Sequence, residues 1–329
     1  MKADIGRRKA ISILIALCTS VGLSVGQTYA ADKYPVKPVT IIVPFPAGGG
    51  TDLAIRSLQP KLQARLGVPI IVENRPGAGG TIGTSAGAKA APDGYTLVAV
   101  TTTTIASAKA VYPQISYDPV KDFVPIGSIG LTPFVLVVAP NLPVKSFDEF
   151  LQYAKAQGGT LNYASVGNGS ASHLVGEWFK RRTGVAMTHV PYRGATPAQM
   201  DLMAGHVQVL FDNPTALVQY VRAGKMKALA ISDTSPILPG VASFESLGLR
   251  DFRPELWYGI MAPAGTPQPV VTQLQTAFAA AVEDGSVKAD LQARGITPLN
   301  MSPSVFASRI SRDAVFWTEI AKSVDARAE

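Results

Sequence analysis

A triple-glycine turn, Gly48–Gly50, is the clearest candidate for binding chemistry in this sequence. The apolar run Val39–Val43 before it has the composition of a buried strand, and a helical pattern begins after it at Leu53. Because glycine has no Cβ, the main-chain N–H groups of such a turn can approach a ligand closely, and they lie at the positive end of the helix dipole. The sequence therefore predicts an anion site.

The residues that follow the glycines indicate which anion. A nucleotide-binding P-loop has Lys and then Ser or Thr after its last glycine, whereas Thr51 and Asp52 stand here. A triphosphate would meet a carboxylate where it needs a cation, so we expect a smaller anion such as a carboxylate. The ligand-binding candidates of this turn are Phe45, Pro46, Ala47, Gly48, Gly49, Thr51 and Asp52.

A second loop repeats this design. The predicted strand Leu161–Val166 leads through a Gly-Asn-Gly turn into a helix with a Ser-rich first turn. If both turns face one cleft, they hold a carboxylate from two sides with neutral N–H and hydroxyl donors. The alternative, that this is only turn and cap chemistry, stays open. The candidates are Ser165, Gly167, Asn168, Gly169, Ser170, Ser172 and His173.

Two more predicted strands end in polar residues. Tyr192 and Arg193 follow one strand, and Asp212 ends the next. Ligands of open α/β sheets bind beyond the carboxyl ends of strands, which favours a binding role for these residues. Arg193 would supply a guanidinium for a distal carboxylate, and Asp212 would accept from a ligand hydroxyl, amine or water. The alternatives are a surface cation and a helix cap.

Metal and cofactor chemistry is not expected. The three histidines, His173, His189 and His206, have no metal-ligand spacing, and the single cysteine, Cys18, lies in the predicted leader. His189 and His206 are interpreted as structural residues. The net charge of +7 is dispersed, without the basic runs and interleaved aromatics typical of nucleic-acid binding.

Two matches to enzyme motifs are weak. Gly83–Gly87 fits the Gly-x-Ser-x-Gly nucleophile elbow, but Ser85 lies in a helical run rather than directly after a strand. Gly77–Ile82 lacks the last glycine of a dinucleotide fingerprint. We therefore do not expect an enzyme; an exported serine hydrolase that uses Ser85 or Ser170 is kept as the alternative.

The N-terminus predicts export to the periplasm. Four cations and the apolar run Ala10–Val25 precede small residues at Thr28–Ala30, which is typical of a signal peptide (residues 1–30) cleaved after Ala30. The pair Arg7-Arg8 leaves both general and twin-arginine export open.

The remaining chain alternates short strands with helices, as α/β folds with mainly parallel sheets do. A long apolar stretch, Val124–Ala139, predicts a crossing into a second domain, and Met226–Ser232 predicts the return. Residues 31–133 and 233–329 then form a discontinuous domain 1, and residues 134–232 an inserted domain 2. Two crossing strands make a hinge, with the ligand in the cleft between the lobes.

Several of these motifs occur together, in order, in one known family. They are Tyr34-Pro35, Pro44–Gly49 with Thr51-Asp52, Val72–Gly80, Pro92–Thr96, Tyr117–Pro119 with Asp122-Phe123, Val190–Gly194 and Phe211-Asp212. Over essentially the whole mature chain, the sequence resembles the periplasmic solute receptors of tripartite tricarboxylate transporters, the Bug-type receptors.

This resemblance implies a two-lobed type II periplasmic binding protein with two parallel or mixed sheets flanked by helices. It implies that the turns Phe45–Asp52 and Ser165–His173 hold one carboxylate through main-chain amides and ordered waters, with Asp212 nearby. The implied partners are a small di-, tri- or aromatic carboxylate and the membrane components of the transporter, with the receptor a monomer. A membrane sensor as partner stays open.

The chain departs from many relatives after the strand Thr96–Thr101, where a run of threonines replaces a His/Asn-Pro pattern. Thr103, Thr104 and Ser107 are therefore expected to shape the far end of the pocket differently.

Overall fold

The computed structural model describes residues 34–112 and 114–323. The predicted signal peptide, its cleavage site after Ala30, and Cys18 lie outside the described residues.

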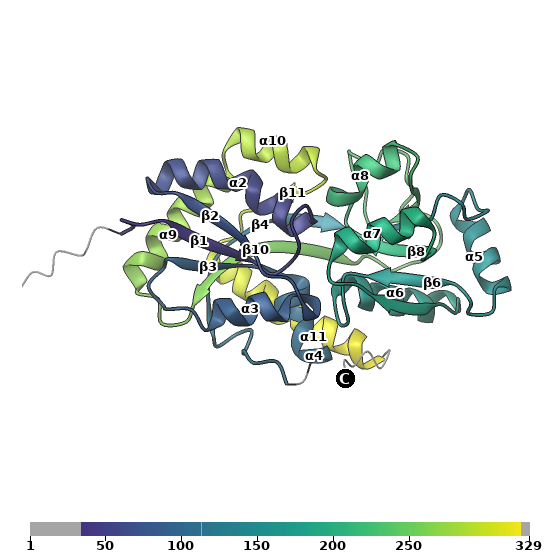
Figure 1. Ribbon diagram of the computed structural model, residues 1–329, viewed down its shortest axis with the longest axis horizontal. Coiled ribbons are helices and arrows are strands. Elements are labelled where there is room, and N and C mark those ends of the chain that lie inside the picture. Colours follow the sequence, from purple (N-terminus) through teal and green to yellow (C-terminus); the bar gives the residue numbers. More distant parts are fainter. Residues whose placement is uncertain (1–33, 113, 324–329) are drawn as a thin grey trace, which may run out of the picture. The chain divides into compact units, whose positions relative to one another are not determined.

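The first sheet has six strands in the order β11-β4-β10-β3-β1-β2. Strand β1 pairs in parallel with β2 and β3, whereas β10 runs antiparallel to β3 and β4 (Figure 1). The predicted strand Thr96–Thr101 is confirmed as β3. The strands are β1 (Val39–Val43), β2 (Ile70–Asn74), β3 (Thr96–Thr101), β4 (Phe123–Pro133), β10 (Glu255–Pro263) and β11 (Thr297–Pro298).

Helices cover both faces of this sheet. Helix α2 packs on β2 and on α9, and α10 packs on both of these helices, while α3 packs on β1 and β3, and α11 on β4. Helix α2 begins at Gly50, three residues before the predicted start at Leu53. The helices are α2 (Gly50–Leu66), η1 (Ala78–Gly80), α3 (Thr81–Ala88), η2 (Thr102–Ser107), α4 (Ala108–Val111), α9 (Gln268–Val282), α10 (Gly285–Ala293) and α11 (Pro303–Ser323).

The second sheet has five strands in the order β7-β6-β8-β5-β9. Strand β6 is parallel to β7 and β8, and β5 is antiparallel to β8 and β9. Its strands are β5 (Val135–Val138), β6 (Asn162–Ser165), β7 (Thr188–Pro191), β8 (Val209–Asp212) and β9 (Lys227–Ile231). Its helices are α5 (Phe147–Ala156), α6 (Ala171–Thr183), α7 (Ala195–Ala204) and α8 (Pro214–Arg222).

The long apolar stretch consists of two strands in two different sheets. Strand β4 ends at Pro133 in the first sheet, and β5 starts at Val135 in the second. The glycines inside β4 make room for packing, because a Cβ at Gly127 would lie 2.6 Å from the Phe278 ring. The predicted return at Met226–Ser232 needs correction: this segment is mostly β9 of the second sheet, and the chain re-enters the first sheet only at β10.

Ser232 joins the two connections between the sheets. The Phe134 N–H donates to Ser232 Oγ at 2.8 Å, and the Ser232 N–H donates to the Phe134 carbonyl at 2.8 Å. Ser232 Oγ in turn donates to the carbonyl of Pro254 at 2.7 Å. Because the hydroxyl is buried, both connections depend on it for their hydrogen bonds.

We expect Ser232→Ala to lower the free energy of unfolding by about 2–3 kcal/mol. The substitution leaves a buried N–H and a buried carbonyl unpaired, each at a cost of about 1–3 kcal/mol before relaxation. Urea denaturation measures the change. Ser311→Ala is the control, since its hydroxyl bonds only Ala307 on an exposed helical face; equal stability of the two variants would contradict the role given to Ser232.

Candidate functional site

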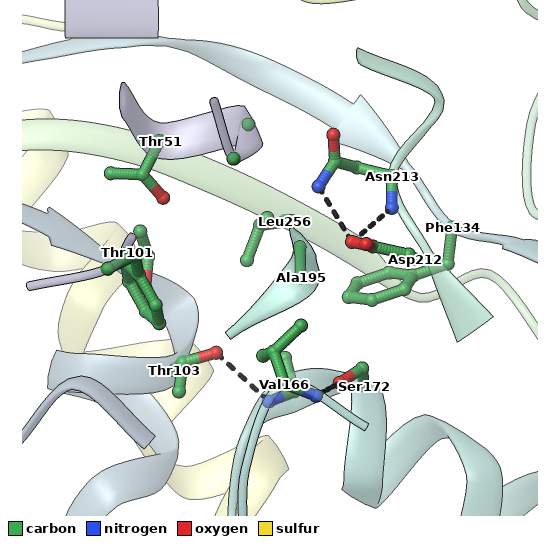
Figure 2. A pocket seen from close by; sticks show the side chains of 14 residues that line it. Thr51, Thr101, Thr103, Phe134, Val166, Ser172, Ala195, Asp212, Asn213 and Leu256 are labelled. Carbon is green, nitrogen blue, oxygen red and sulfur yellow. Dashed lines mark hydrogen bonds between the residues drawn. The ribbon is translucent and has the colours of Figure 1, made fainter. Parts of the chain in front are cut away.

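A pocket, partly open to solvent, lies where strand ends and helix starts of both sheets converge. Figure 2 shows Thr51 at the start of α2, Thr101 at the end of β3 and Thr103 on one side, and Asp212, Asn213 and Phe134 on the other. It is lined by Phe45, Gly49, Gly50, Thr51, Thr101, Thr103, Phe134, Val166, Ala171, Ser172, Ala195, Asp212, Asn213 and Leu256.

Four helices present their N-termini to this pocket. They are α2, α6, α7 and α8, which contribute Gly50, Ala171, Ala195 and Asn213 or their neighbours to the lining. The N-termini of α2, α7 and α8 have no side-chain cap. First-turn N–H groups have no acceptor within their own helix, and the helix dipole adds positive potential there. The lining contains no Lys, Arg or His, so its positive potential comes from neutral groups.

Asp52 stabilises the β1–α2 turn by hydrogen bonds and is not part of the pocket lining. Its Oδ2 accepts from the Gly48 N–H at 3.0 Å and from Arg56 Nε at 2.9 Å, and its Oδ1 accepts from Asn74 Nδ2 at 2.9 Å. The same Asn74 nitrogen donates to the carbonyl of Phe45. Burial raises the pKa of Asp52, but the bonds from Arg56, Gly48 and Asn74 outweigh it and leave the pKa below 3.8. The structure thus places Asp52 behind the turn.

We expect Asp52→Ala to cost about 2–3 kcal/mol of folding stability, because hydrogen bonds to a charged group are lost at a buried position. The lowered pKa means that Asp52 stabilises the fold above about pH 4 and that this contribution is lost as the pH falls through its folded-state pKa. Denaturation between about pH 2 and 7 should therefore show a smaller acid dependence for the variant than for the parent. Asp52→Asn, which keeps one acceptor, is expected to fall between them; parental stability of Asp52→Ala at neutral pH would refute this role.

In the second loop, Ser172 lines the pocket and Ser170 does not. Ser170 is the N-cap of α6: its hydroxyl accepts from the His173 N–H and donates to the Gly167 carbonyl at 2.7 Å. Ser172 Oγ accepts from the Val166 N–H at 3.0 Å (Figure 2). For Ser170 the structure thus shows the capping role.

The loop glycines permit close approach to the first sheet's segments. A Cβ on Gly167 would lie 3.0 Å from the Gly79 nitrogen, and one on Gly169 would lie 2.3 Å from Val111. The carbonyl of Asn168 accepts from the hydroxyl of Tyr112. These three candidates are therefore placed at chain contacts and outside the lining.

His173 and His189 form a stacked pair, with ring centroids 3.8 Å apart and planes within 5°. His173 Nδ1 accepts from the Gly169 N–H at 3.0 Å, and Ser165 Oγ lies 2.6 Å from His189 Nε2. Burial lowers the pKa of His173 to about 4 and that of His189 to about 3. Both rings are neutral near pH 7, so His173 holds the loop and supplies no cation to the pocket.

The threonines at the end of β3 and after it have different roles. Thr103 lines the pocket, and its Oγ1 accepts from the Ala171 N–H at 3.0 Å, which joins η2 to the start of α6 (Figure 2). Thr104 instead forms a reciprocal cap with Thr101 and is buried away from the pocket. Ser107 donates to the Thr103 and Gly169 carbonyls.

Arg193 is exposed and lies outside the pocket lining. This agrees with the alternative that Arg193 is a surface cation. The hydroxyl of Tyr192 donates to Asp201 at 2.6 Å. The next residue, Gly194, packs so closely on Pro46 that a Cβ there would lie 2.3 Å from the proline ring.

The predicted residues outside the lining are Pro46, Ala47, Gly48, Asp52, Thr104, Ser165, Gly167, Asn168, Gly169, Ser170, His173, Tyr192 and Arg193.

Sequence reasoning missed eight lining residues. Gly50 belongs to the recognised triple-glycine turn, and Ala195 and Asn213 begin helices directly after predicted strand ends, so a stricter use of strand–helix junctions would have found them. Phe134 and Leu256 lie where the chain passes between the sheets, and no local signal marks them. The missed residues are Gly50, Thr101, Phe134, Val166, Ala171, Ala195, Asn213 and Leu256.

Asp212 is the acidic side chain of the lining. Its Oδ1 accepts from the N–H and the Nδ2 of Asn213 at 2.8 and 2.9 Å (Figure 2). Its Oδ2 accepts from Gln199 Nε2 at 3.1 Å. Burial raises its pKa from 3.8 to about 6, although the bonds from Asn213 and Gln199 lower it. Beside it, the hydroxyls of Thr215 and Tyr258 and Oδ1 of Asn213 are buried without a hydrogen-bond partner in the described protein.

The described residues contain no group of three or more His, Cys, Asp or Glu arranged to hold a metal ion. Within the same residues, no helix is both long and apolar enough to span a bilayer.

Two α/β lobes joined by crossing strands, with a pocket at converging strand ends, define a two-lobed type II periplasmic binding protein. The model of the tripartite tricarboxylate transporter family receptor matches residues 54–325. The chain belongs to this family.

Individual relatives cover almost the whole chain. Protein BugT of Bordetella pertussis is 37% identical over 301 residues, 91% of this chain and 92% of BugT. A structure of an R. palustris protein with adipate superposes with a TM-score of 0.87 at 33% identity, covering 90% of this chain and 100% of that one. MatC of Rhodopseudomonas palustris with bound malate gives a TM-score of 0.83 at 34% identity, covering 87% and 99%.

Proposed function

We propose that this protein captures a small carboxylate in the periplasm and delivers it to the membrane components of a tripartite tricarboxylate-type transporter. The observation that carries the proposal is the pocket itself, where four helix N-termini meet without a basic side chain in the lining. Such a site attracts a small anion and holds it by hydrogen bonds from N–H groups and from hydroxyls such as that of Thr51.

The relatives support the ligand class. One is solved with adipate and another with malate, both dicarboxylates. We extend this class to the present chain as di-, tri- or aromatic carboxylates. The proposed division places residues 31–133 and 233–329 in one lobe and residues 134–232 in the other, so that closure about the crossings makes the bound form recognisable to the membrane partner.

The same proposal includes export with cleavage after Ala30, action as a monomer, and the absence of catalysis. The serine hydrolase alternative has little geometric support in the described residues. Ser85 Oγ bonds Ser116 Oγ at 2.7 Å, and Ser170 is a helix cap. A receptor for a membrane sensor would use the same pocket with another partner.

The test is isothermal calorimetry on ligand-free, refolded protein with succinate, adipate, malate, citrate, benzoate and L-aspartate. We expect at least one carboxylate to bind, and its uncharged methyl ester or amide to bind far more weakly. Failure of every carboxylate would refute the proposal. An ester-cleaving activity that Ser85→Ala abolishes would favour the hydrolase.

A further inference from the structure

The pocket holds an acidic side chain at the place where an anionic ligand is proposed to bind. Asp212 lines the pocket at 4% exposure, and three protein donors already bond its carboxylate. Asp212 lines the same pocket as the helix starts that are proposed to bind the ligand carboxylate, among them Gly50 and Ala171. A ligand carboxylate and an ionised Asp212 would therefore place two negative charges in one small site.

No Lys, Arg or His in the pocket lining compensates the second charge. On α2, which also contributes to the lining, Arg56 is bonded to Asp52 and Asn74. Around Asp212, α7 presents the Gln199 amide, the start of α8 presents Asn213 and Thr215, and β10 presents the hydroxyl of Tyr258. Burial raises the pKa of Tyr258, and the carboxylate of Asp212 raises it further. The charged residues of these elements are bonded elsewhere: Asp201 to Tyr192 and His206, Arg222 to the Ile237 carbonyl, and Glu255 to Arg309.

We propose that binding of a carboxylate is coupled to the uptake of one proton, which Asp212 holds in the complex. The inference rests on the proposed function of this pocket. Two carboxyl groups that share a site of low water content retain one proton between them, as a like charge disfavours ionisation of the second group. The neutral Asp212 is then a hydrogen-bond donor toward the ligand, while its Oδ1 keeps both bonds from Asn213.

In the free protein, Asp212 is already close to accepting a proton. Burial has already raised the pKa of Asp212 to about 6, so near neutral pH the side chain is ionised but needs little further shift to accept a proton. The negative charge of Asp212 would alternatively be compensated by an ammonium group on the ligand. Binding would then take up no proton and be restricted to amino acids. Proton uptake and an ammonium group on the ligand are therefore distinguishable by experiment.

The experiment titrates succinate and adipate into the parent and into Asp212→Asn, between about pH 6 and 8, in phosphate and in Tris buffer. The two buffers differ in heat of ionisation, so the difference in measured enthalpy counts the protons taken up on binding. For the parent we expect a count that approaches one and a dissociation constant that rises up to about tenfold per pH unit above pH 6.

Asp212→Asn removes the titrating group and keeps its shape. Its amide oxygen accepts from Asn213 as before, and Gln199 can rotate its amide to accept from the new NH₂ group. We expect a proton count near zero above about pH 7, where both probes are fully ionised, a flat affinity, and binding at pH 8 at least about tenfold tighter than the parent. Thermal melting checks that the variant is folded, and the buffer comparison on the parent alone does not depend on it.

Each outcome is decisive. Binding of either probe by the parent without proton uptake, or binding by the parent of L-aspartate alone without uptake, overturns the inference but leaves the proposed function standing. Loss of binding in the folded variant, together with zero uptake in the parent, also overturns it, because Asp212 would then act as an ionised acceptor. Failure of every carboxylate to bind the parent removes the proposed function and this inference with it.

Discussion

Replacing Gly49 by aspartate is expected to abolish carboxylate binding, with at least a hundredfold loss of affinity, while the fold remains intact. Gly49 lines the pocket as the N-cap of α2, at φ −75° and ψ 164°, a conformation open to any residue. Two like charges about 4 Å apart repel by roughly 4 kcal/mol at the effective dielectric constant near a protein surface. The new carboxylate would also cap the helix itself and occupy the N–H groups that the ligand needs.

The matched control is Gly49→Asn, which has the same size and capping ability without the charge. We expect it to weaken binding much less than the aspartate variant. Calorimetry with the carboxylate found to bind gives both affinities, and circular dichroism with thermal melting tests the fold. Equal losses for the two variants would show that space, and not charge, decides binding at this turn.

Gly50→Ala is expected to damage both the site and the fold, although it adds a single methyl group. A Cβ at Gly50 would lie 2.7 Å from Asn213 Oδ1 and 2.7 Å from the hydroxyl of Tyr258. Both groups are buried, and the Asn213 side chain is further held by its bond to Asp212. Overpacking of this kind costs about 1–3 kcal/mol, and here it separates the start of α2 from the start of α8. We expect a loss of carboxylate affinity of about tenfold or more along with the loss of stability.

Gly49→Ala is the control next to it in the chain. Its Cβ would meet nothing closer than the Pro46 carbonyl at 3.4 Å, an ordinary contact distance. We expect near-parental stability and binding. Chemical denaturation and calorimetry on both variants make the comparison, and a Gly50→Ala protein as stable as Gly49→Ala would contradict the packing shown around α2.

Much of the fold could be predicted from local sequence, because the junctions between strands and helices have characteristic turn and cap residues. Thr96–Thr101 is the predicted strand without a shift of either end. Met226–Ser232 was misplaced because an edge strand of one sheet and a crossing between sheets have the same apolar composition. Pairing with β5, which is not local, decides the matter.

The ligand site stays a prediction, and six of its nineteen predicted residues line the pocket. The first glycine turn, Thr103 and Asp212 line one pocket together with Ser172 from the start of α6. The glycine turn before α6 lies outside that lining. Asp52, Ser170 and His173 belong to the same loops, but their side chains face their own backbone, where they satisfy N–H groups of the turn. A polar residue beside a binding turn serves either the ligand or the turn, and spacing along the chain does not separate the two.

The sequence by itself determined the α/β class and the family, and it predicted an anion site at glycine turns before helices, because each of these is recorded in short-range pattern. Only the tertiary structure decided which of three successive glycines has no room for a methyl group and which polar side chains reach the pocket. It also showed that Asp212 is buried in a pocket whose described lining has no Lys, Arg or His. Those properties depend on groups such as Tyr258 and Gln199, which come from distant segments and meet only when the sheets and helices pack.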